Sequence, residues 1–423
     1  MRDLTNLAGN VRTSHSMANR VALTVVFTLS FLSYMAPELT ASVQLVPLVL
    51  LGVLVFFKVF WSAGIVDALW SLFELDGLLY VLFISLLAIA PSLASGSERS
   101  FELALVISGC LILARLYMAV VPVREVFEAF FWSGILSVSI YIPLSFADLM
   151  QSATTLERFW NFSFHPNLLA FVLAGYFCAM VWKFLTGDWR MKVLTGLVGP
   201  VCLIIIFFAS SRGSIVGIIA GGSLIAATAI LGAKRETQRK VLRFGLLGVA
   251  ALLGLLLLIR NRPWAQDASS FVDQVLQLSQ DYRGIDSGFS GRLNKWNATL
   301  QVFSDGTWLL GHGIRTSDSM EDQLIDNSFL VILYEIGMLP LILITLRFLS
   351  ISSKFVSGYF RVKEEQERYL CLSCSLLMVV LLVNSVVARL LFGVGNPYSL
   401  LALFLFAAPA SRIVPRLSNR INN

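Results

Sequence analysis

The sequence predicts an all-α, polytopic membrane protein, and three observations carry that prediction. Hydrophobic residues make up 57% of the 423-residue chain. Charged residues make up only 14%, against about 25% in soluble domains. The apolar residues also gather in runs, such as 21–37 and 193–210, whose lengths approach the ~20 residues of a membrane-crossing helix. Composition therefore excludes a water-soluble globular protein.

Counting the apolar runs predicts about 12 transmembrane helices, with boundaries good to a few residues. The runs lie at 21–37, 41–61, 76–94, 101–121, 126–147, 166–184, 191–209, 213–232, 241–260, 327–347, 369–389 and 397–413. They divide the chain into three parts. Residues 1–260 carry membrane helices 1 to 9, residues 261–326 form one large loop, and residues 327–423 carry membrane helices 10 to 12.

The distribution of Lys and Arg predicts the orientation of these helices. With both termini in the cytoplasm, basic residues on the cytoplasmic side, including those of 233–243 and 347–368, outnumber those outside by more than two to one. The reverse orientation would invert this bias. The net charge of +6 is therefore a membrane-topology signal, and it does not point to nucleic acid as a partner.

The long loop at 261–326 then faces outward, and loops of this length are usually functional. Two segments within it, 269–280 and 291–303, space their apolar residues as a helix does. We expect short amphipathic helices that lie at the membrane surface.

Arg212 is the first candidate functional residue, at the outer junction of the seventh and eighth runs. A snorkelling anchor would explain an arginine at a helix end. Ser211 precedes it and a new helix begins after it. Free backbone N–H groups, hydroxyls and a guanidinium together suit a phosphate. We therefore favour anion binding over anchoring.

Three further segments carry polar candidates, each with a simpler structural explanation. Arg292, with Trp296 one turn on, fits the charged face of an amphipathic helix. His312 sits in a tight glycine-flanked turn, where it satisfies local backbone groups. Asp326 and Asn327 begin the tenth run, where Asp is a preferred helix cap. The functional alternative for Asp326 is a general base at the membrane surface.

The remaining acids predict no metal site. Glu335 lies nine residues inside the tenth run, about 13 Å deep, and a structural ion pair with Arg115 or Arg389 is the expected explanation. The acidic residues of 318–326 lack the compact spacing of metal ligands, and we interpret them as charged side chains exposed to solvent. No metal or other cofactor is expected.

An ordered series of segments resembles the O-antigen polymerase and ligase superfamily, which includes exopolysaccharide polymerases. The series is FHPNLLAF (164–171), SSRGSIVG (210–217), SGRLNKW (290–296), LLGHGI (309–314) and DNSFLVILYEIGMLPLIL (326–343). Each motif alone is weak, whereas their order and the large outer loop before the tenth run are fairly specific. The resemblance covers most of the chain from about residue 160.

This resemblance implies a C-type glycosyltransferase-like fold that works on the periplasmic face of the bacterial inner membrane. The donor would be a glycan on undecaprenyl diphosphate, and the acceptor a second lipid-linked glycan or lipid A core. A flippase and a chain-length regulator are possible partners. Arg212 and Arg292 match the family's outer-face arginines, which would stabilise the departing diphosphate without a metal.

The resemblance also assigns the remaining candidates. Asp326 is expected to be catalytic, with His312 and then His165 as other candidate bases. The substrate-binding candidates are Ser211, His312, Asn327, Trp296, His165 and Asn167. The family's ligases commonly carry His where this chain has Asp326, so the motif favours a polymerase of lipid-linked repeat units. The alternatives are an O-antigen ligase and, from another class, a lipid or polysaccharide transporter.

Overall fold

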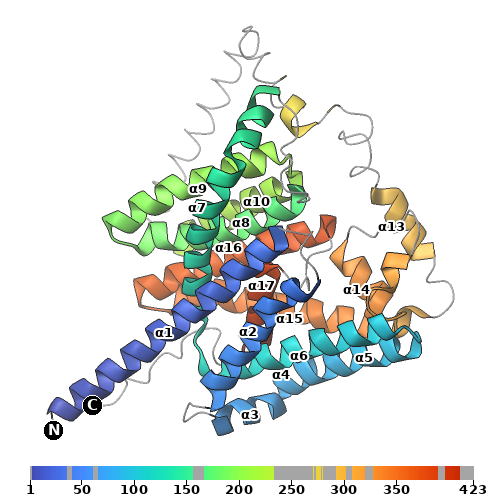
Figure 1. Cartoon of the computed structure of the whole chain (residues 1–423), viewed down its shortest axis with the longest axis horizontal. Coiled ribbons are helices and arrows are strands. Elements are labelled where there is room, and N and C mark those ends of the chain that lie inside the picture. The colour runs from blue at the N-terminus through green and yellow to red at the C-terminus, as the bar shows by residue number, and fades with distance from the viewer. Residues whose placement is uncertain are drawn as a thin grey trace.

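The computed structural model describes most of the chain. The described residues are 2–35, 41–60, 65–155, 166–232, 270, 273–277, 279, 292–301, 307–319, 327–388 and 396–409. The regular elements in those ranges are helices (Figure 1). Helices suit lipid because they satisfy their own backbone hydrogen bonds.

Two groups of helices follow each other along the chain. The first group is α1 (Arg2–Met35), α2 (Ala41–Phe60), α3 (Ile65–Phe73), α4 (Leu75–Gly77), the π-helix η1 (Leu78–Phe83), α5 (Ile84–Ala94), α6 (Glu98–Val120), α7 (Val123–Thr155), α8 (Pro166–Thr186), α9 (Trp189–Phe208) and α10 (Arg212–Gly232). The second group is α13 (Arg292–Gln301), the 3-10 turns η4 (Thr307–Leu309) and η5 (Thr316–Ser319), α14 (Ser328–Ile336), α15 (Met338–Arg361), α16 (Glu365–Val387) and α17 (Pro397–Ala407).

Eight described helical stretches are long and apolar enough to cross a bilayer, and three shorter ones are apolar. The eight are Ser16–Ser33, Leu75–Ala94, Glu98–Val120, Val123–Ser152, Pro166–Thr186, Trp189–Phe208, Met338–Arg361 and Glu365–Val387, and the three are Val46–Phe60, Arg212–Thr228 and Pro397–Ala407. Each predicted run within the described ranges contains a helix, whereas run 241–260 lies outside them. The chain is a multi-pass membrane protein, and the total of twelve spans stays a prediction.

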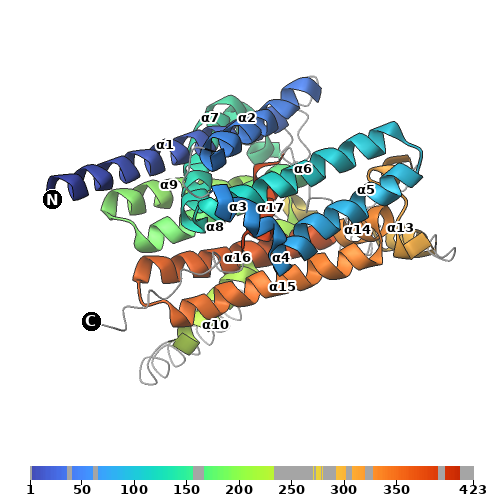
Figure 2. The same ribbon diagram turned by 90° about the horizontal axis from the view of Figure 1, so that it is seen from below.

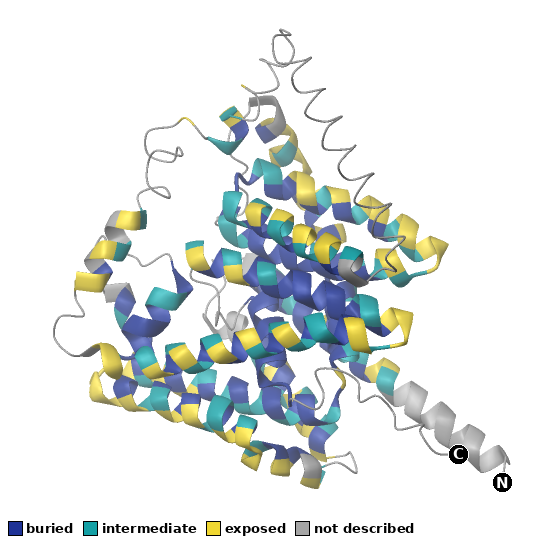
Figure 3. Cartoon of the chain, turned by 180° about the vertical axis from the view of Figure 1, so that it is seen from behind, coloured by how far each residue is buried: buried dark blue, intermediate teal, exposed yellow. Residues whose placement is uncertain are grey.

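Large apolar side chains face outward from the helix bundle. Phe56, Phe57 and Phe60 on α2 are each more than half exposed, as are Trp70 and Leu75 further along the chain. Figure 3 shows buried residues along the inner faces of the helices and exposed ones on the outer faces. Apolar surface of this extent fits contact with lipid and does not fit contact with water.

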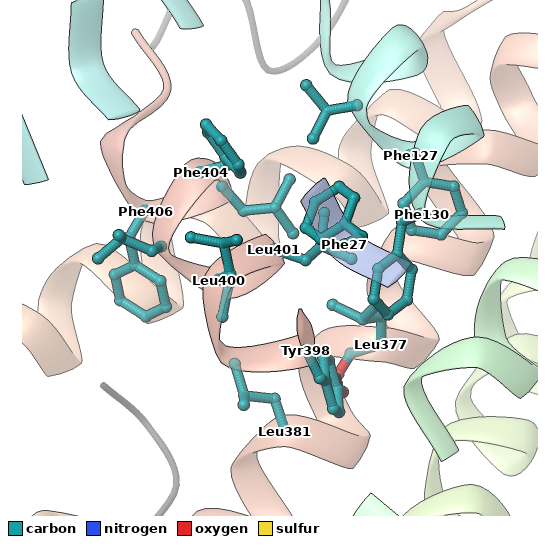
Figure 4. Packing of buried hydrophobic residues seen from close by; sticks show 14 of the residues in the cluster. Phe27, Phe127, Phe130, Leu377, Leu381, Tyr398, Leu400, Leu401, Phe404 and Phe406 are labelled. Carbon is teal, nitrogen blue, oxygen red and sulfur yellow. Dashed lines mark hydrogen bonds between the residues drawn. The ribbon is translucent and has the colours of Figure 1, made fainter. Parts of the chain in front are cut away.

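The centre of the bundle is α17, all 11 residues of which are buried. The Phe404 ring packs edge-on against Phe27 of α1, and Tyr398 donates a 2.6 Å hydrogen bond to the Leu377 carbonyl of α16 (Figure 4). At 1.5 Å per residue α17 is about 16 Å long, half of the hydrocarbon thickness. Its C-terminal end therefore lies inside the bundle.

Two arginines cap the C-terminal end of α17 by donating hydrogen bonds to its last carbonyl groups. Arg115 of α6 donates to the Ala407 carbonyl at 3.2 Å, and Arg347 of α15 donates to the Phe406 carbonyl at 2.9 Å. Cations are favourable at a helix C-terminus, where the backbone carbonyls carry partial negative charge. Asp76 lies 2.9 Å from Arg115 and 3.7 Å from Arg347. The buried charges are thus both paired and hydrogen-bonded.

This arrangement corrects two expectations from the sequence. Arg347 is only 2% exposed within α15, so its assignment to a cytoplasmic segment is wrong. Arg115 pairs with Asp76 and Glu74, and the proposed pairing of Arg115 with Glu335 is wrong. Sequence pattern missed both because each guanidinium binds carbonyl and carboxylate groups from helices distant in the chain.

The two ends of the bundle carry different elements (Figures 1 and 2). The α5–α6 turn, α13 and α14 lie at one end, which we call the α14 end. The start of α1 and the α8–α9 and α15–α16 turns lie at the opposite end. Because α9 and α16 run towards the α14 end, the α9–α10 junction and the last turn of α16 lie there too.

The tenth predicted span, 327–347, is two helices. α14 ends at Ile336, Gly337 takes a φ of 93°, and α15 begins at the next residue. A Cβ on Gly337 would lie 2.3 Å from the Leu309 carbonyl oxygen, so the 307–319 loop packs into the break. The single-span prediction is wrong because hydropathy is continuous across the glycine.

Candidate active site

The turn between α9 and α10 places Arg212 at the beginning of a helix. Ser210 takes a φ of 52°, which reverses the chain, and α10 begins two residues later. Gly213 follows, and a Cβ there would lie 2.6 Å from a methyl carbon of Val387 on α16. Glycine therefore lets the first turn of α10 rest directly against α16. The backbone N–H groups of that turn point towards the α14 end.

The hydroxyl of Ser211 is occupied within this turn. It donates to Ser214 at 3.2 Å, and Ser214 in turn donates to the side-chain oxygen of Asn384 at 2.9 Å. All three side chains are buried. Ser211 therefore helps to fix the start of α10.

Arg292 is brought close to Arg212, although the two are far apart in the chain. Arg292 is the first residue of α13. Burial and, after it, the positive charge of Arg292 lower the pKa of the Arg212 guanidinium. Both arginines are half-buried. Two like charges held together at the starts of two helices favour an anion that contacts both. Trp296, also half-buried, follows one turn later on α13.

Asn327, and not Asp326, caps α14. The Asn327 side-chain oxygen accepts from the backbone N–H groups of Phe329 at 2.9 Å and Leu330 at 3.1 Å. Asp326 itself lies outside the described residues, so only the capping explanation for it is overturned. The capping bonds occupy the Asn327 oxygen and do not involve its amide nitrogen.

His312 contacts the other end of α14. Its backbone N–H donates to the Tyr334 carbonyl at 2.9 Å, its Nδ1 lies 3.1 Å from the same oxygen, and its ring stacks on the Tyr334 ring. A carbonyl only accepts, so Nδ1 carries the proton and Nε2 of the neutral ring is an acceptor. Tyr334 is six residues from Ser328, about 9 Å along the helix. His312 and Asn327 therefore lie at opposite ends of α14.

Glu335 has a structural role beside this turn. Its carboxylate accepts a 2.5 Å hydrogen bond from Ser317, and its backbone carbonyl accepts from Gly313 at 2.8 Å. The loop also reaches the α5–α6 hairpin, because the Ile314 N–H donates to the Ser92 hydroxyl at 3.0 Å. These bonds clamp the 307–319 loop against α14 and α5.

Of the two remaining sequence candidates, one lies at the start of α8. Asn167 is the second residue of that helix and is half-buried, whereas His165 lies outside the described residues. Within the part of the chain that the structure describes, no three His, Cys, Asp or Glu residues are grouped to hold a metal ion.

Sequence reasoning missed Ser214 and Asn384. Asn384 is 2% exposed inside α16, a candidate membrane span. The available signal was a single amide within the apolar run 369–389, because polar residues inside a membrane span need a partner and often serve function.

The comparison with known families supports the resemblance seen in the motifs. No curated protein matches the chain. Residues 197–345 match the family model described as O-antigen ligase, and this stretch is about a third of the chain. The match runs from α9 into α15 and so includes Arg212, Arg292 and α14. The predicted resemblance to the O-antigen polymerase and ligase superfamily is therefore confirmed over the matched residues 197–345.

Proposed function

We propose that this protein polymerises oligosaccharide repeat units linked to undecaprenyl diphosphate, on the periplasmic face of the bacterial inner membrane. The observation that carries the proposal is the pair of arginines, Arg212 and Arg292, which the start of α10 and the start of α13 bring together. The proposal includes the C-type glycosyltransferase-like fold with twelve spans, the loop at 261–326, and cytoplasmic termini. The α14 end then faces the periplasm.

The arginine pair suits the leaving group of this reaction. An acceptor hydroxyl oxygen bonds to the anomeric carbon of the donor sugar, and the bond from that carbon to the diphosphate oxygen breaks. The undecaprenyl diphosphate that departs gains negative charge as this bond breaks. Two guanidinium groups and the N–H groups at the start of α10 stabilise that charge in the transition state.

The acceptor hydroxyl must lose its proton, and Asp326 is our assignment for the base. Asp326 directly precedes the cap of α14, whose first turn is fixed to α16 because Ser328 donates to the Ala388 carbonyl at 2.7 Å. His312 is the alternative, because its Nε2 is an acceptor whose direction is set by the Nδ1 bond. Trp296 and the Asn327 amide nitrogen would contact the glycan, as would Asn167 and His165.

An O-antigen ligase is the second candidate function, and the description of the matching family model favours it. A ligase would transfer the same donor glycan to lipid A core. The Asp at position 326, where the family's ligases carry His, supports the polymerase. Both activities use the same donor chemistry, so the arginine pair serves either.

The experiment that separates these functions uses purified protein in lipid with undecaprenyl-diphosphate-linked repeat units. A ladder of products in multiples of the repeat, formed without lipid A core, supports the polymerase. Transfer only after lipid A core is added supports the ligase. Movement of intact lipid-linked glycan across the bilayer, with no new glycosidic bond, would contradict both and support a transporter.

A further inference from the structure

We propose that Asn384 is a positioning residue that fixes Arg212 relative to α14. This inference rests on the proposed function, because it concerns the placement of the arginine that would contact the diphosphate. Asn384 itself lies within α16 and has no direct role in the chemistry.

The amide of Asn384 is buried, and both its oxygen and its nitrogen are hydrogen-bonded. Its oxygen accepts from Ser214 of α10 at 2.9 Å, and its nitrogen donates to the Val380 carbonyl of its own helix at 2.9 Å. An apolar side chain would be the simpler choice at this position inside the helix bundle, because burying an amide is costly unless it is hydrogen-bonded. The hydrogen bond to Ser214 of α10 therefore explains why a polar side chain is present at this buried position.

Two glycines make this bond specific for one position of α10 along α16. Cβ atoms on Gly213 and Gly217 would each lie 3.5 Å from the Asn384 amide, and the Gly217 Cβ would lie 3.2 Å from the Val380 backbone. Ser214 lies between these glycines. The two helices therefore approach closely here, and one side-chain hydrogen bond sets their register, as a buried asparagine does in helix pairs.

The residue that directly follows α16 also holds α14. The Ala388 carbonyl, one helical turn beyond Asn384, accepts the Ser328 hydrogen bond at 2.7 Å. The C-terminal end of α16 with its cap residue Ala388 is consequently a common support for the helix that carries Arg212 and for the helix that follows Asp326. A slip of α10 by one residue would displace Arg212 by about 1.5 Å relative to α14.

The test compares Asn384→Leu and Ser214→Ala with the wild type in the lipid-linked glycan assay, and Ser385→Ala is the matched control. Ser385 is the neighbouring residue, is fully buried, and its hydroxyl has no hydrogen-bond partner in the described part of the chain. We expect either test variant to lower kcat at least about tenfold, because small misplacements of catalytic groups are costly. We expect KM for the donor and the control to stay at wild-type values. The thermal unfolding midpoint of Ser214→Ala should fall somewhat, because the buried Asn384 oxygen loses its donor, so all rates are measured at a temperature where every variant is folded.

The double variant is expected to be no slower than the slower single variant, because both changes remove the same bond. Equal kcat in all variants would overturn the positioning role, as would a loss of kcat that only follows a loss of stability. If Asn384→Leu does not fold, Ser214→Ala decides alone.

Arg212→Ala, measured in the same assay, separates this inference from the proposed function. If Arg212→Ala is inactive while Asn384→Leu and Ser214→Ala are as fast as the wild type, only the positioning role fails. If Arg212→Ala keeps wild-type kcat, the proposed function fails and the positioning role fails with it.

Discussion

At the scale of single residues, we propose different residues for the leaving diphosphate and for the acceptor. Arg212 and Arg292 are close to each other at the starts of α10 and α13. Asp326 precedes α14, and His312 contacts the far end of that helix. The resemblance to the superfamily predicted all four residues. The sequence did not predict which of them lie together, because that depends on helix packing between distant segments.

The assignment of the base gives a prediction at this scale. Asp326→Asn keeps the size of the side chain but removes its ability to take a proton, and we expect kcat to fall about 10²- to 10⁴-fold. His312→Asn, which retains a donor for the Tyr334 carbonyl, should fall by less than tenfold. Initial rates of polymer formation at matched protein levels measure both. A large loss in His312→Asn with little in Asp326→Asn would transfer the role to His312.

At the scale of elements, hydropathy located the helices but not their breaks or their polar supports. The runs at 101–121 and 166–184 correspond closely to α6 and α8. The run at 327–347 does not correspond to one helix, because the φ of Gly337 ends α14 and the 307–319 loop packs into the break. A glycine in an apolar run carries no mark of its φ, so this break needed tertiary structure.

The break at Gly337 predicts a stability difference between two glycines with positive φ. A Cβ on Gly337 would meet the Leu309 backbone at 2.3 Å, whereas a Cβ on Gly96, in the α5–α6 turn, would meet nothing within 4 Å. Gly96→Ala therefore carries only the left-handed backbone cost of about 1 kcal/mol. Gly337→Ala adds a clash and should lose more than about 2 kcal/mol. Unfolding in detergent measures both, and equal losses would argue against the packed break.

The charges at the end of α17 give a second prediction for an element. Asp76→Asn leaves Arg115 and Arg347 without their common carboxylate, and breaking a buried pair costs roughly 3 kcal/mol. Glu74→Gln is the matched control, because the Glu74 side chain is 55% exposed and such pairs contribute about 1 kcal/mol or less. Thermal unfolding of the two variants should differ clearly. Equal midpoints would show that Asp76 does not stabilise the arginines.

At the scale of the whole molecule, composition was enough to predict a helical bundle in a membrane. Apolar residues are 57% of the chain, and the outward faces of helices such as α2 are apolar. Arg347 could not be placed from the sequence. An arginine at the edge of an apolar run is expected in a cytoplasmic loop, whereas Arg347 is buried against α17. Charges that pair across distant helices cannot be told from surface charges by sequence position.

The orientation of the bundle is a prediction for the whole molecule. Ser97 in the α5–α6 turn and Arg190 at the start of α9 are both exposed, at opposite ends of the bundle. The five native cysteines are buried, so introduced cysteines should dominate labelling. Ser97→Cys is expected to react with a membrane-impermeant maleimide on intact cells, and Arg190→Cys only after permeabilisation. The opposite pattern would place the α14 end in the cytoplasm.

The most direct test of the central claim follows both products of the reaction with wild-type protein and Arg212→Ala. The wild type should form a ladder of glycan multiples and release one undecaprenyl diphosphate for each new linkage. Arg212→Ala, folded and present at the same level, should lose at least about 10²-fold in rate, the cost of removing one group that stabilises developing charge. If Arg212→Ala forms the same ladder at the same rate as the wild type, Arg212 does not stabilise the leaving diphosphate and the proposed function is contradicted.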